Sequence, residues 1–256
     1  MKIATWNVNS LRARLPHVLR WLDANQPDAL ALQETKTEDR NFPVAEFERS
    51  GYHAAFSGQP SYNGVALLSR EPPEVIATAL PDFEDAQKRV LLASIGDVAI
   101  LNLYVPNGQS VDSDKYRYKL DWLAQLALWL QQLLRQHREL VVLGDFNVAP
   151  EDRDVYDPKA WEGQVLVSAA ERAAFHKLLQ PGLRDSFRLH TEGGGHYSWW
   201  DYRASAFRRN QGLRIDHILL SQALAERSAA TLIDREPRGW ERPSDHTPVI
   251  AELSAP

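Results

Sequence analysis

Short runs of apolar residues divide the chain into segments of strand length. The clearest run is Leu140-Val141-Val142-Leu143, which is followed by a glycine. A continuous apolar run of this length is typical of a strand that is covered on both faces. Similar apolar or alternating runs, bordered by turn residues, predict strands at residues 1–8, 29–33, 64–68, 90–95, 98–105, 196–202, 213–220 and 249–253.

Apolar residues at helical spacing predict three helices between these strands. The first begins near Leu15, because Pro16 favours a place in the first turn of a helix. The second covers residues 114–136 and carries a stripe of Trp and Leu, which core packing explains far better than ligand binding. The third opens at Ser168, which forms a capping-box pattern with Glu171. The chain therefore alternates strands and helices, as in an α/β protein.

Polar side chains stand at the C-terminal ends of three predicted strands. They are Asn7, Glu34 and the pair Asp145 and Asn147. Asp and Asn also occur in ordinary turns, where they form local hydrogen bonds, so one such strand end indicates nothing more than a turn. Three strand ends of the same kind indicate a shared polar site that is held by a rigid core.

Two later segments carry further polar groups in unexpected places. Asp216 stands before an apolar run, and Asp245 and His246 lie in a loop with Pro243 and Pro248 on either side. The prolines restrict the backbone, so this Asp-His pair is held in place before any ligand binds. A loop histidine taken alone is more often simply solvated. The Asp-His pair indicates a functional site only in combination with the other polar strand ends.

Composition is that of an ordinary globular chain of 256 residues, 44% of them hydrophobic and 25% charged. Pro and Gly are spread along the sequence and form no linker, which predicts one domain over residues 1–256. The absence of Cys excludes disulfides and thiolate chemistry and favours a cytoplasmic protein. No apolar stretch has the length of a signal peptide or of a membrane span, so we expect no contact with a membrane.

The net charge of −5 argues mildly against a protein that coats nucleic acid without specificity. Two basic segments remain, and each taken alone is better explained as a solvated surface. They contain Lys115, Arg117 and Lys119 with interleaved Tyr116 and Tyr118, and Arg203, Arg208, Arg209 and Arg214.

Seven segments together resemble the exonuclease III family of DNA-repair nucleases, within the deoxyribonuclease-I-like endonuclease/exonuclease/phosphatase superfamily. They occur in family order along nearly the whole chain. The segments are Trp6-Asn7-Val8-Asn9, Leu32-Gln33-Glu34, Asn63-Gly64-Val65-Ala66, Tyr104-Val105-Pro106-Asn107-Gly108, Gly144-Asp145-Phe146-Asn147, Gly212-Leu213-Arg214-Ile215-Asp216 and Ser244-Asp245-His246-Thr247-Pro248. The resemblance implies a four-layer α/β sandwich, in which two mixed β-sheets pack face to face between helices, with a site at one end.

The resemblance also implies a divalent metal, because carboxylates alone would repel a phosphodiester. We expect Mg²⁺, with Mn²⁺ as the alternative. Glu34 is the expected main ligand, and water would complete most of the octahedral shell. Asp245 and Asn9 are further candidate ligands, since Asp245 could hold a second metal or support the His246 loop.

Roles for the catalytic residues follow from the same family pattern. Asp145 would activate or orient the attacking water, and Asn147 would fix the geometry of the phosphate. His246, oriented by Asp216, would stabilise the charge that develops on the phosphate. Two further candidates, for orientation and for contact with the phosphate or leaving group, are Asn7 and Tyr104.

The resemblance implies double-stranded DNA with abasic sites or damaged 3′ ends as the partner of a monomeric enzyme. Trp200 and Leu213 fall at positions that would enclose an extruded abasic sugar. The loop at Asn107 and four basic residues would contact DNA, and these residues are Lys115, Arg117, Arg208 and Arg209. The chain has Leu213 where one branch of the family has Trp, and Ser10 where many members have Gly. These departures leave the balance between abasic-site and 3′-end activity open.

We therefore expect a phosphodiester hydrolase that cleaves DNA 5′ to abasic sites, with 3′-5′ exonuclease or 3′-end-cleaning activity. One alternative keeps the fold and changes the substrate to RNA or phospholipid. Another is a nucleic-acid-binding regulator that has lost its chemistry. The predicted catalytic residues are all present, which argues against such a regulator.

Overall fold

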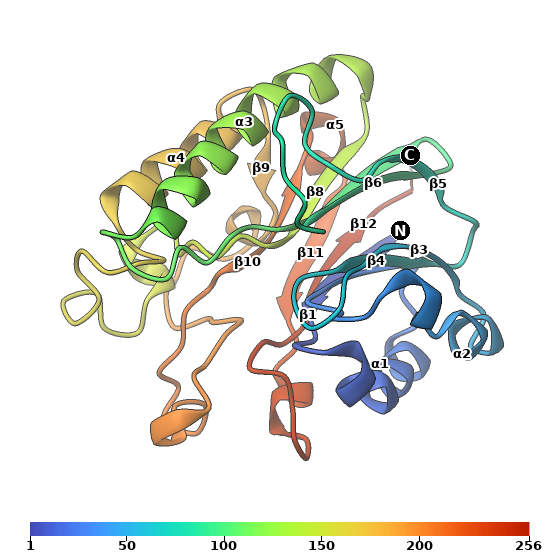
Figure 1. Ribbon diagram of the computed structural model, residues 1–256, viewed down its shortest axis with the longest axis horizontal. Coiled ribbons are helices and arrows are strands. Elements are labelled where there is room, and N and C mark those ends of the chain that lie inside the picture. Colours follow the sequence, from blue (N-terminus) through green and yellow to red (C-terminus); the bar gives the residue numbers. More distant parts are fainter. Residues whose placement is uncertain (256) are drawn as a thin grey trace.

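The computed structural model describes residues 1–255, and its strands form two mixed six-stranded sheets that pack face to face (Figure 1). In spatial order, the first sheet contains β11 (Ser228–Ile233), β12 (Val249–Leu253), β1 (Lys2–Asn7), β2 (Ala29–Gln33), β4 (Val65–Ser69) and β3 (His53–Ser57). The second contains β5 (Glu74–Ala77), β6 (Val90–Ile95), β7 (Val98–Tyr104), β8 (Leu140–Asp145), β10 (Asp216–Leu220) and β9 (Arg184–Asp185). Each sheet has one parallel pair, β1 with β2 and β7 with β8.

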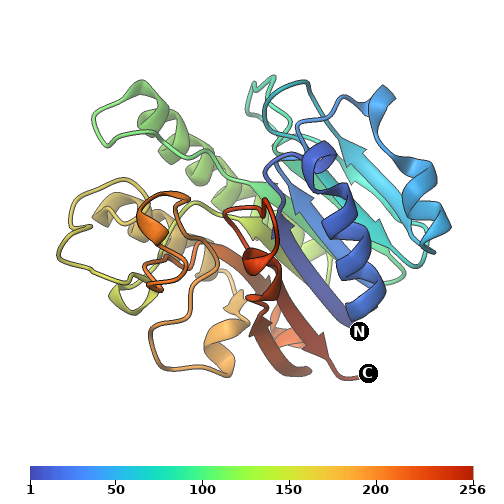
Figure 2. The same cartoon turned by 90° about the horizontal axis from the view of Figure 1, so that it is seen from below.

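Helices cover the outer face of each sheet, which gives the four layers expected from the sequence (Figures 1 and 2). The first sheet is covered by α1 (Leu11–Asn25) and α2 (Val44–Arg49), and the second by α3 (Asp114–Gln136) and α4 (Ala169–Leu179). Shorter helical segments lie in the loops, and they are η1 (Asp39–Asn41), η2 (Asp152–Asp154), η3 (Phe187–Leu189), η4 (Arg203–Ser205), α5 (Gln222–Ala225) and η5 (Glu236–Gly239).

The apolar run on β8 is explained by its place between two hydrophobic layers. Val141 and Leu143 pack between the two sheets, whereas Leu140 and Val142 pack on the opposite face against α3 and α4. Because side chains alternate along a strand, a strand covered on both faces needs apolar residues at every position. The prediction of a doubly covered strand is thus confirmed, and it places Asp145 at the end of the central strand of the core.

A buried amide also connects the two sheets close to the strand ends. The Asn102 side chain on β7 donates hydrogen bonds to the carbonyl oxygens of Leu32 (3.0 Å) and Ala66 (2.8 Å) on the facing sheet. Its own oxygen accepts a hydrogen bond from Gln33 at 2.7 Å. Such a network fixes the relative position of the sheets, since each bond would otherwise leave a buried polar group unpaired.

Several predicted elements differ from the observed ones. Residues 196–202 form a loop instead of a strand, because Trp199 makes single bridges to two different partners and no continuous ladder. The strand predicted at 213–220 begins at Asp216, and Leu213 before it makes only isolated bridges. The sequence patterns also missed α2 and four strands at or near the sheet edges, namely β3, β5, β9 and β11.

The first helix begins at Leu11, four residues before the predicted start, and Pro16 lies inside it. Proline in this position removes one backbone donor, and burial of Leu11, Val18, Trp21 and Leu22 in the outer layer outweighs that loss. The other two helices are confirmed, including the capping box at the start of α4. Within the described residues, no helix is both long and apolar enough to cross a membrane.

Candidate active site

The polar strand ends meet at one edge of the sandwich. Asp145 on β8 and Asp216 on β10 are direct neighbours in an antiparallel pair, and Asn7 ends β1 on the facing sheet. Glu34 follows β2, and His246 lies in the loop before β12. Both sheets therefore contribute to one cluster, as the sequence predicted from the shared strand-end pattern.

Gly144 allows β8 to deliver Asp145 to this edge. Its φ of 139° lies in a region that favours glycine, and a Cβ atom there would come within 1.9 Å of the Leu103 carbonyl oxygen on β7. Any larger residue would push the two strands apart just before the catalytic end. The glycine is therefore a steric requirement of the site.

Asn7 connects two carboxylates that come from different sheets. Its side-chain nitrogen donates to Glu34 Oε1 and to Asp145 Oδ2, each at 2.9 Å. Its oxygen accepts the Asn9 backbone N–H at 3.0 Å. Because Asn7 is fully buried and all these bonds are made, it holds the two carboxylates at a fixed separation.

His246 is held between two carboxylates. Its Nδ1 lies 2.8 Å from Asp216 Oδ2, and its Nε2 lies 3.6 Å from Asp145 Oδ2. Burial alone would lower the pKa of this histidine, but Asp216 and Asp145 outweigh it and raise the pKa to about 10. His246 is therefore an imidazolium at neutral pH, suited to bind an anion.

Asp145 is completely buried at the centre of the cluster. Burial raises the pKa of its carboxyl to about 7; the His246 charge opposes the rise, and Asp216 adds to it. The carboxylate also accepts the backbone N–H of Asn147 at 2.9 Å. A buried carboxyl with a pKa near neutral is suited to accept a proton from water.

Asn147, two residues after Asp145, faces a second side-chain amide, that of Asn107 in the loop after β7. Asn147 donates from its side chain to the Val105 carbonyl (2.9 Å) and accepts from the Asn107 side chain (3.2 Å). Its φ of 48° is a left-handed conformation, so the chain turns sharply directly after Asp145. The structure thus brings together the loop at Asn107 and the loop at Asn147, which the sequence placed in separate motifs.

Tyr104 closes the cluster on the side of β7. Burial raises the pKa of its hydroxyl well above the ordinary value, and the Glu34 and Asp145 carboxylates add to this effect. The hydroxyl is therefore a neutral donor at physiological pH. The Arg89 guanidinium lies over the Tyr104 ring at 4.9 Å, a partner that the sequence motifs did not indicate.

The oxygen donors near Glu34 suit a hard divalent cation. Single atoms from Glu34, Asp145 and His246 lie within 4.8 Å of one another, but an imidazolium offers no lone pair to a metal. The Lys36 ammonium lies 3.0 Å from Glu34 Oε2 and 2.6 Å from Asn9 Oδ1. Positive charge thus already lies between two of the predicted ligands, so the donor set fits a cation.

Asp245, the third predicted metal ligand, makes other contacts. Its carboxylate accepts the Asn9 side-chain N–H at 3.1 Å and the Trp199 indole N–H at 3.0 Å. Both oxygens are thus engaged in holding neighbouring parts of the site. This arrangement agrees with the supporting role that the sequence left open for Asp245.

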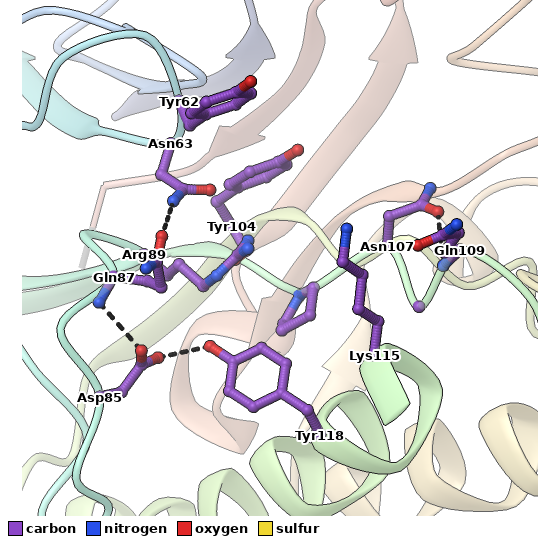
Figure 3. A pocket seen from close by; sticks show the side chains of 12 residues that line it. Tyr62, Asn63, Asp85, Gln87, Arg89, Tyr104, Asn107, Gln109, Lys115 and Tyr118 are labelled. Atoms are coloured by element: carbon purple, nitrogen blue, oxygen red, sulfur yellow. Dashed lines mark hydrogen bonds between the residues drawn. The ribbon is translucent and has the colours of Figure 1, made fainter. Parts of the chain in front are cut away.

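A cavity of about 860 Å³ extends from the catalytic cluster along Tyr104 (Figure 3). Arg89 and Lys115 contribute positive charge to its lining, and Tyr62 and Tyr118 contribute aromatic surface. Figure 3 shows Lys115 and Asn107 on one side of this cavity and Arg89 on the other. The combination of cations and aromatic surface is suited to a nucleic-acid backbone and its bases.

The structure places both residues of the predicted sugar-binding wall in the interior. Trp200 is completely buried, where it packs on Phe207 and donates its indole N–H to Asn210. Leu213 is also fully buried, so neither side chain offers surface to a ligand in this conformation. Trp199 is the half-buried ring near the site, and its bridge to His246 was missed because two adjacent tryptophans look alike in the sequence.

The two basic segments each divide into exposed and buried cations. Lys115, Arg117, Arg208 and Arg209 are exposed, as DNA contacts would be. Lys119 and Arg214 were grouped with them in the sequence, but the structure shows both fully buried and paired with acids. The spacing of charges alone cannot distinguish the two faces of an element whose burial is unknown.

A buried imidazolium, two carboxylates that converge on it and the adjacent Glu34 carboxylate, which suits a divalent cation, form the arrangement of a metal-dependent phosphoesterase. The chain belongs to the endonuclease/exonuclease/phosphatase family, whose model matches residues 4–246. It is 40% identical over 267 residues to exodeoxyribonuclease III of Haemophilus influenzae, a match that covers 99% of this chain and 100% of the relative.

Two solved structures extend this similarity to the whole fold. One is the 3′ phosphatase NExo from Neisseria bound to a product DNA hairpin, with a TM-score of 0.97 and 46% identity. The other is an AP endonuclease from Archaeoglobus fulgidus, with a TM-score of 0.96 and 42% identity. Each alignment covers 100% of both chains. The protein is accordingly a DNA-repair nuclease that hydrolyses its substrate with the help of a metal.

Proposed function

We propose that this nuclease is a Mg²⁺-dependent hydrolase that cleaves double-stranded DNA 5′ to abasic sites and removes damaged or blocked 3′ ends. The observation that carries the proposal is the convergence of Asp145, Asp216 and His246 with Glu34 at one edge of the two sheets. Similarity to a 3′ phosphatase and to an AP endonuclease supports both activities. Mn²⁺ is the alternative metal.

These activities share one chemical step. Cleavage 5′ to an abasic site, removal of a 3′ nucleotide and removal of a 3′ phosphate all break the bond between phosphorus and a 3′ oxygen. The substrates differ only in what the phosphorus carries on its other side: an abasic sugar, a normal nucleotide or nothing. One set of catalytic residues therefore serves all three substrates, and the space next to the site decides among them.

The roles of the side chains follow from their protonation and position. Asp145 accepts the proton of the attacking water, and Asn7 fixes its orientation. The His246 imidazolium, held by Asp216, stabilises the negative charge that grows on the phosphate oxygens. Tyr104 and Asn147 offer hydrogen bonds to the phosphate and the leaving 3′ oxygen.

Glu34 would hold the metal, with Asn9 as a further oxygen donor, and Lys36 would move aside from its place between them. The bound cation would polarise the phosphate and stabilise the leaving oxygen. Asp245 would support this arrangement indirectly through Asn9 and Trp199.

DNA would approach along the exposed cations on both sides of the cluster. Lys115 and Arg117 lie in the first turn of α3, where Lys115 lines the cavity. Arg208 and Arg209 lie on the projecting segment near residue 205, orange in Figure 1. Contacts to phosphates from both groups would fix the register of the duplex without reading its sequence.

The hydrophobic cluster around Leu213, next to the site, leaves no open space for a sugar. This favours 3′-end removal as the stronger activity. Leu213 and Ile215 are at most 1% exposed and pack with Trp199 in a hydrophobic cluster. A 3′ phosphate needs no space there, whereas an abasic sugar requires this cluster to open and a normal nucleotide requires more room still. We therefore expect catalytic efficiency to fall in that order.

The test uses matched DNA duplexes that carry a 3′ phosphate, an internal abasic analogue or an unmodified 3′ end. We expect cleavage with Mg²⁺, none with chelator, and kcat/KM values that decrease in the order given. Binding without cleavage under every metal would leave only the regulator alternative. Faster hydrolysis of RNA tails or of phosphoinositide vesicles would identify a different substrate class.

We also infer that the chain acts as one domain and as a monomer, because both sheets of a single chain supply the catalytic residues. A cytoplasmic enzyme agrees with a chain that contains no Cys. Light scattering of the protein with and without duplex DNA would test the monomer, and a dimer at working concentrations would contradict it.

A further inference from the structure

A buried lysine lies directly behind the two amides of the site. Lys119 on α3 is 0% exposed, and its ammonium donates to the carbonyl oxygens of Asn147 (2.6 Å) and Asn107 (3.1 Å). Its third bond goes to Glu171 on α4 at 2.5 Å. All three donors of the ammonium are thus used, two of them on the loops that carry the candidate catalytic amides.

This lysine is not needed to fill space. Its neighbours on the buried face of α3 are Trp122, Leu123 and Leu126, and an apolar residue would continue that stripe. Burying an ion pair is often no more stable than packing apolar residues of similar volume. A buried lysine at this position therefore points to a function other than stability.

Glu171 connects the ammonium to a rigid frame. Its carboxylate accepts the backbone N–H groups of Leu166 (3.0 Å) and Ser168 (3.2 Å) and also the Ser168 hydroxyl. That hydroxyl lies 2.6 Å from the Tyr116 hydroxyl on α3. The pair is thus anchored to two helices and cannot shift without disturbing the capping box of α4.

The loop at Asn107 is built to approach the lysine closely. Gly108 has a φ of 93°, and a Cβ atom there would lie 3.2 Å from Lys119 Cδ. The loop after Asp145 is equally constrained, with Asn147 at a φ of 48°. Both loops adopt uncommon conformations where they meet the ammonium, as expected if it holds them in place.

We propose that Lys119, fixed by Glu171, is a positioning residue that holds the Asn107 and Asn147 loops in the geometry required for hydrolysis. The proposal rests on the proposed function of the site, since it assigns the effect of Lys119 to Asn147. It also distinguishes Lys119 from its neighbours Lys115 and Arg117, whose exposed cations would bind DNA.

The first test separates positioning from DNA binding. Lys119→Met removes the charge and keeps the length of the side chain. We expect kcat on the 3′-phosphate duplex to fall on the order of 10- to 100-fold, the effect of a displacement of about 1 Å. KM and the salt dependence of DNA affinity should stay at wild-type values. A weakened affinity with a smaller salt slope would instead make Lys119 a phosphate contact and overturn the proposal.

Removing the lysine alone leaves the Glu171 charge buried, which could prevent folding. The double variant Lys119→Met/Glu171→Gln removes both charges, and circular dichroism would verify its fold. We expect it to have the same low kcat as Lys119→Met, and we expect Lys119→Arg, which keeps charge and donors, to recover part of it. Wild-type kcat in the folded double variant would overturn the proposal.

The second test asks whether Lys119 acts through Asn147. In a double-mutant cycle with Asn147→Ala, we expect Lys119→Met to lower kcat by less than about twofold, because the side chain it positions is already absent. If the two substitutions lower kcat independently, so that their fold-changes multiply, Lys119 has a general structural role instead. Arg227→Met, which breaks an ion pair with Glu139 before the start of β8, is the control and should leave kcat unchanged. An inactive wild type would refute the proposed function; an active wild type matched by Lys119→Met refutes only this inference.

Discussion

The strand ends and the segment at residues 196–215 border the same catalytic cluster, but they are built differently. Asn7, Asp145 and Asp216 stand on or at the end of hydrogen-bonded strands, each fixed by a ladder within a sheet. The segment at 196–215 is a loop that makes only single bridges. In our proposal, the rigid strand ends carry the groups that every substrate needs, and the loop determines what fits beside the phosphorus.

The largest expected effect would come from the strand ends. Asp145→Asn removes the proton acceptor, so turnover on every substrate should fall on the order of 10²- to 10⁴-fold. DNA affinity should be unchanged or higher, since a repulsive charge is lost. Single-turnover kinetics and equilibrium binding measure the two quantities, and Asp97→Asn at the exposed β6–β7 turn is the control. Loss of activity on only one substrate would contradict the proposal that the strand ends serve every substrate.

His217 joins the two regions and should make stability depend on pH. It follows Asp216 on β10, contacts Arg214 and lies 2.9 Å from the Val148 carbonyl oxygen in the loop after β8. Burial and the Arg214 charge lower its pKa from 6.5 to about 4, and Asp185 and Asp154 oppose them. The neutral form is favoured by folding, so its contribution is complete above pH 6.5 and is lost as pH falls towards 4.

The loss attributable to His217 amounts to about 3 kcal/mol. To measure it, the free energies of unfolding of wild type and of His217→Gln are determined in urea at pH 7.5 and at pH 4, and the difference between the two proteins is compared at the two pH values. The variant lacks this titration, so the difference between the two proteins should shrink as the pH falls. A difference that does not change with pH would mean that His217 keeps its ordinary pKa.

The wall segment should change substrate choice and leave the shared chemistry intact. Leu213→Ala opens space beside Trp199 and should raise kcat/KM for the abasic duplex about tenfold relative to the 3′-phosphate duplex, equivalent to about 1.4 kcal/mol. Leu126→Ala, in the core of α3, is the control for lost packing. Equal effects on both substrates would show that the wall does not control choice.

The sequence predicted those features of the site that follow from regular spacing along the strands, and it missed those that do not. Asp145 and Asn7 could be found because a strand pattern places their side chains, and the family motifs assigned their partners. Trp199 and Trp200 could not be separated, since an irregular loop gives no rule for which ring faces the site. Lys119 was placed among exposed cations because helical spacing does not distinguish one buried cation from its solvated neighbours.

The smallest effect concerns a residue that departs from the family pattern within the rigid region. Ser10 has a φ of 90°, where glycine is favoured, and it is held there because its N–H donates to the Glu34 carbonyl at 2.8 Å. Ser10→Gly should relieve this strain and raise the free energy of unfolding by about 1 kcal/mol, after the added flexibility of the unfolded chain is counted. Activity on the 3′-phosphate duplex should stay unchanged, because no side-chain bond of Ser10 caps α1. A change in the ratio of abasic to 3′-end activity would show that this strand end also takes part in substrate choice. That role would then not belong to the loop at residues 196–215 alone.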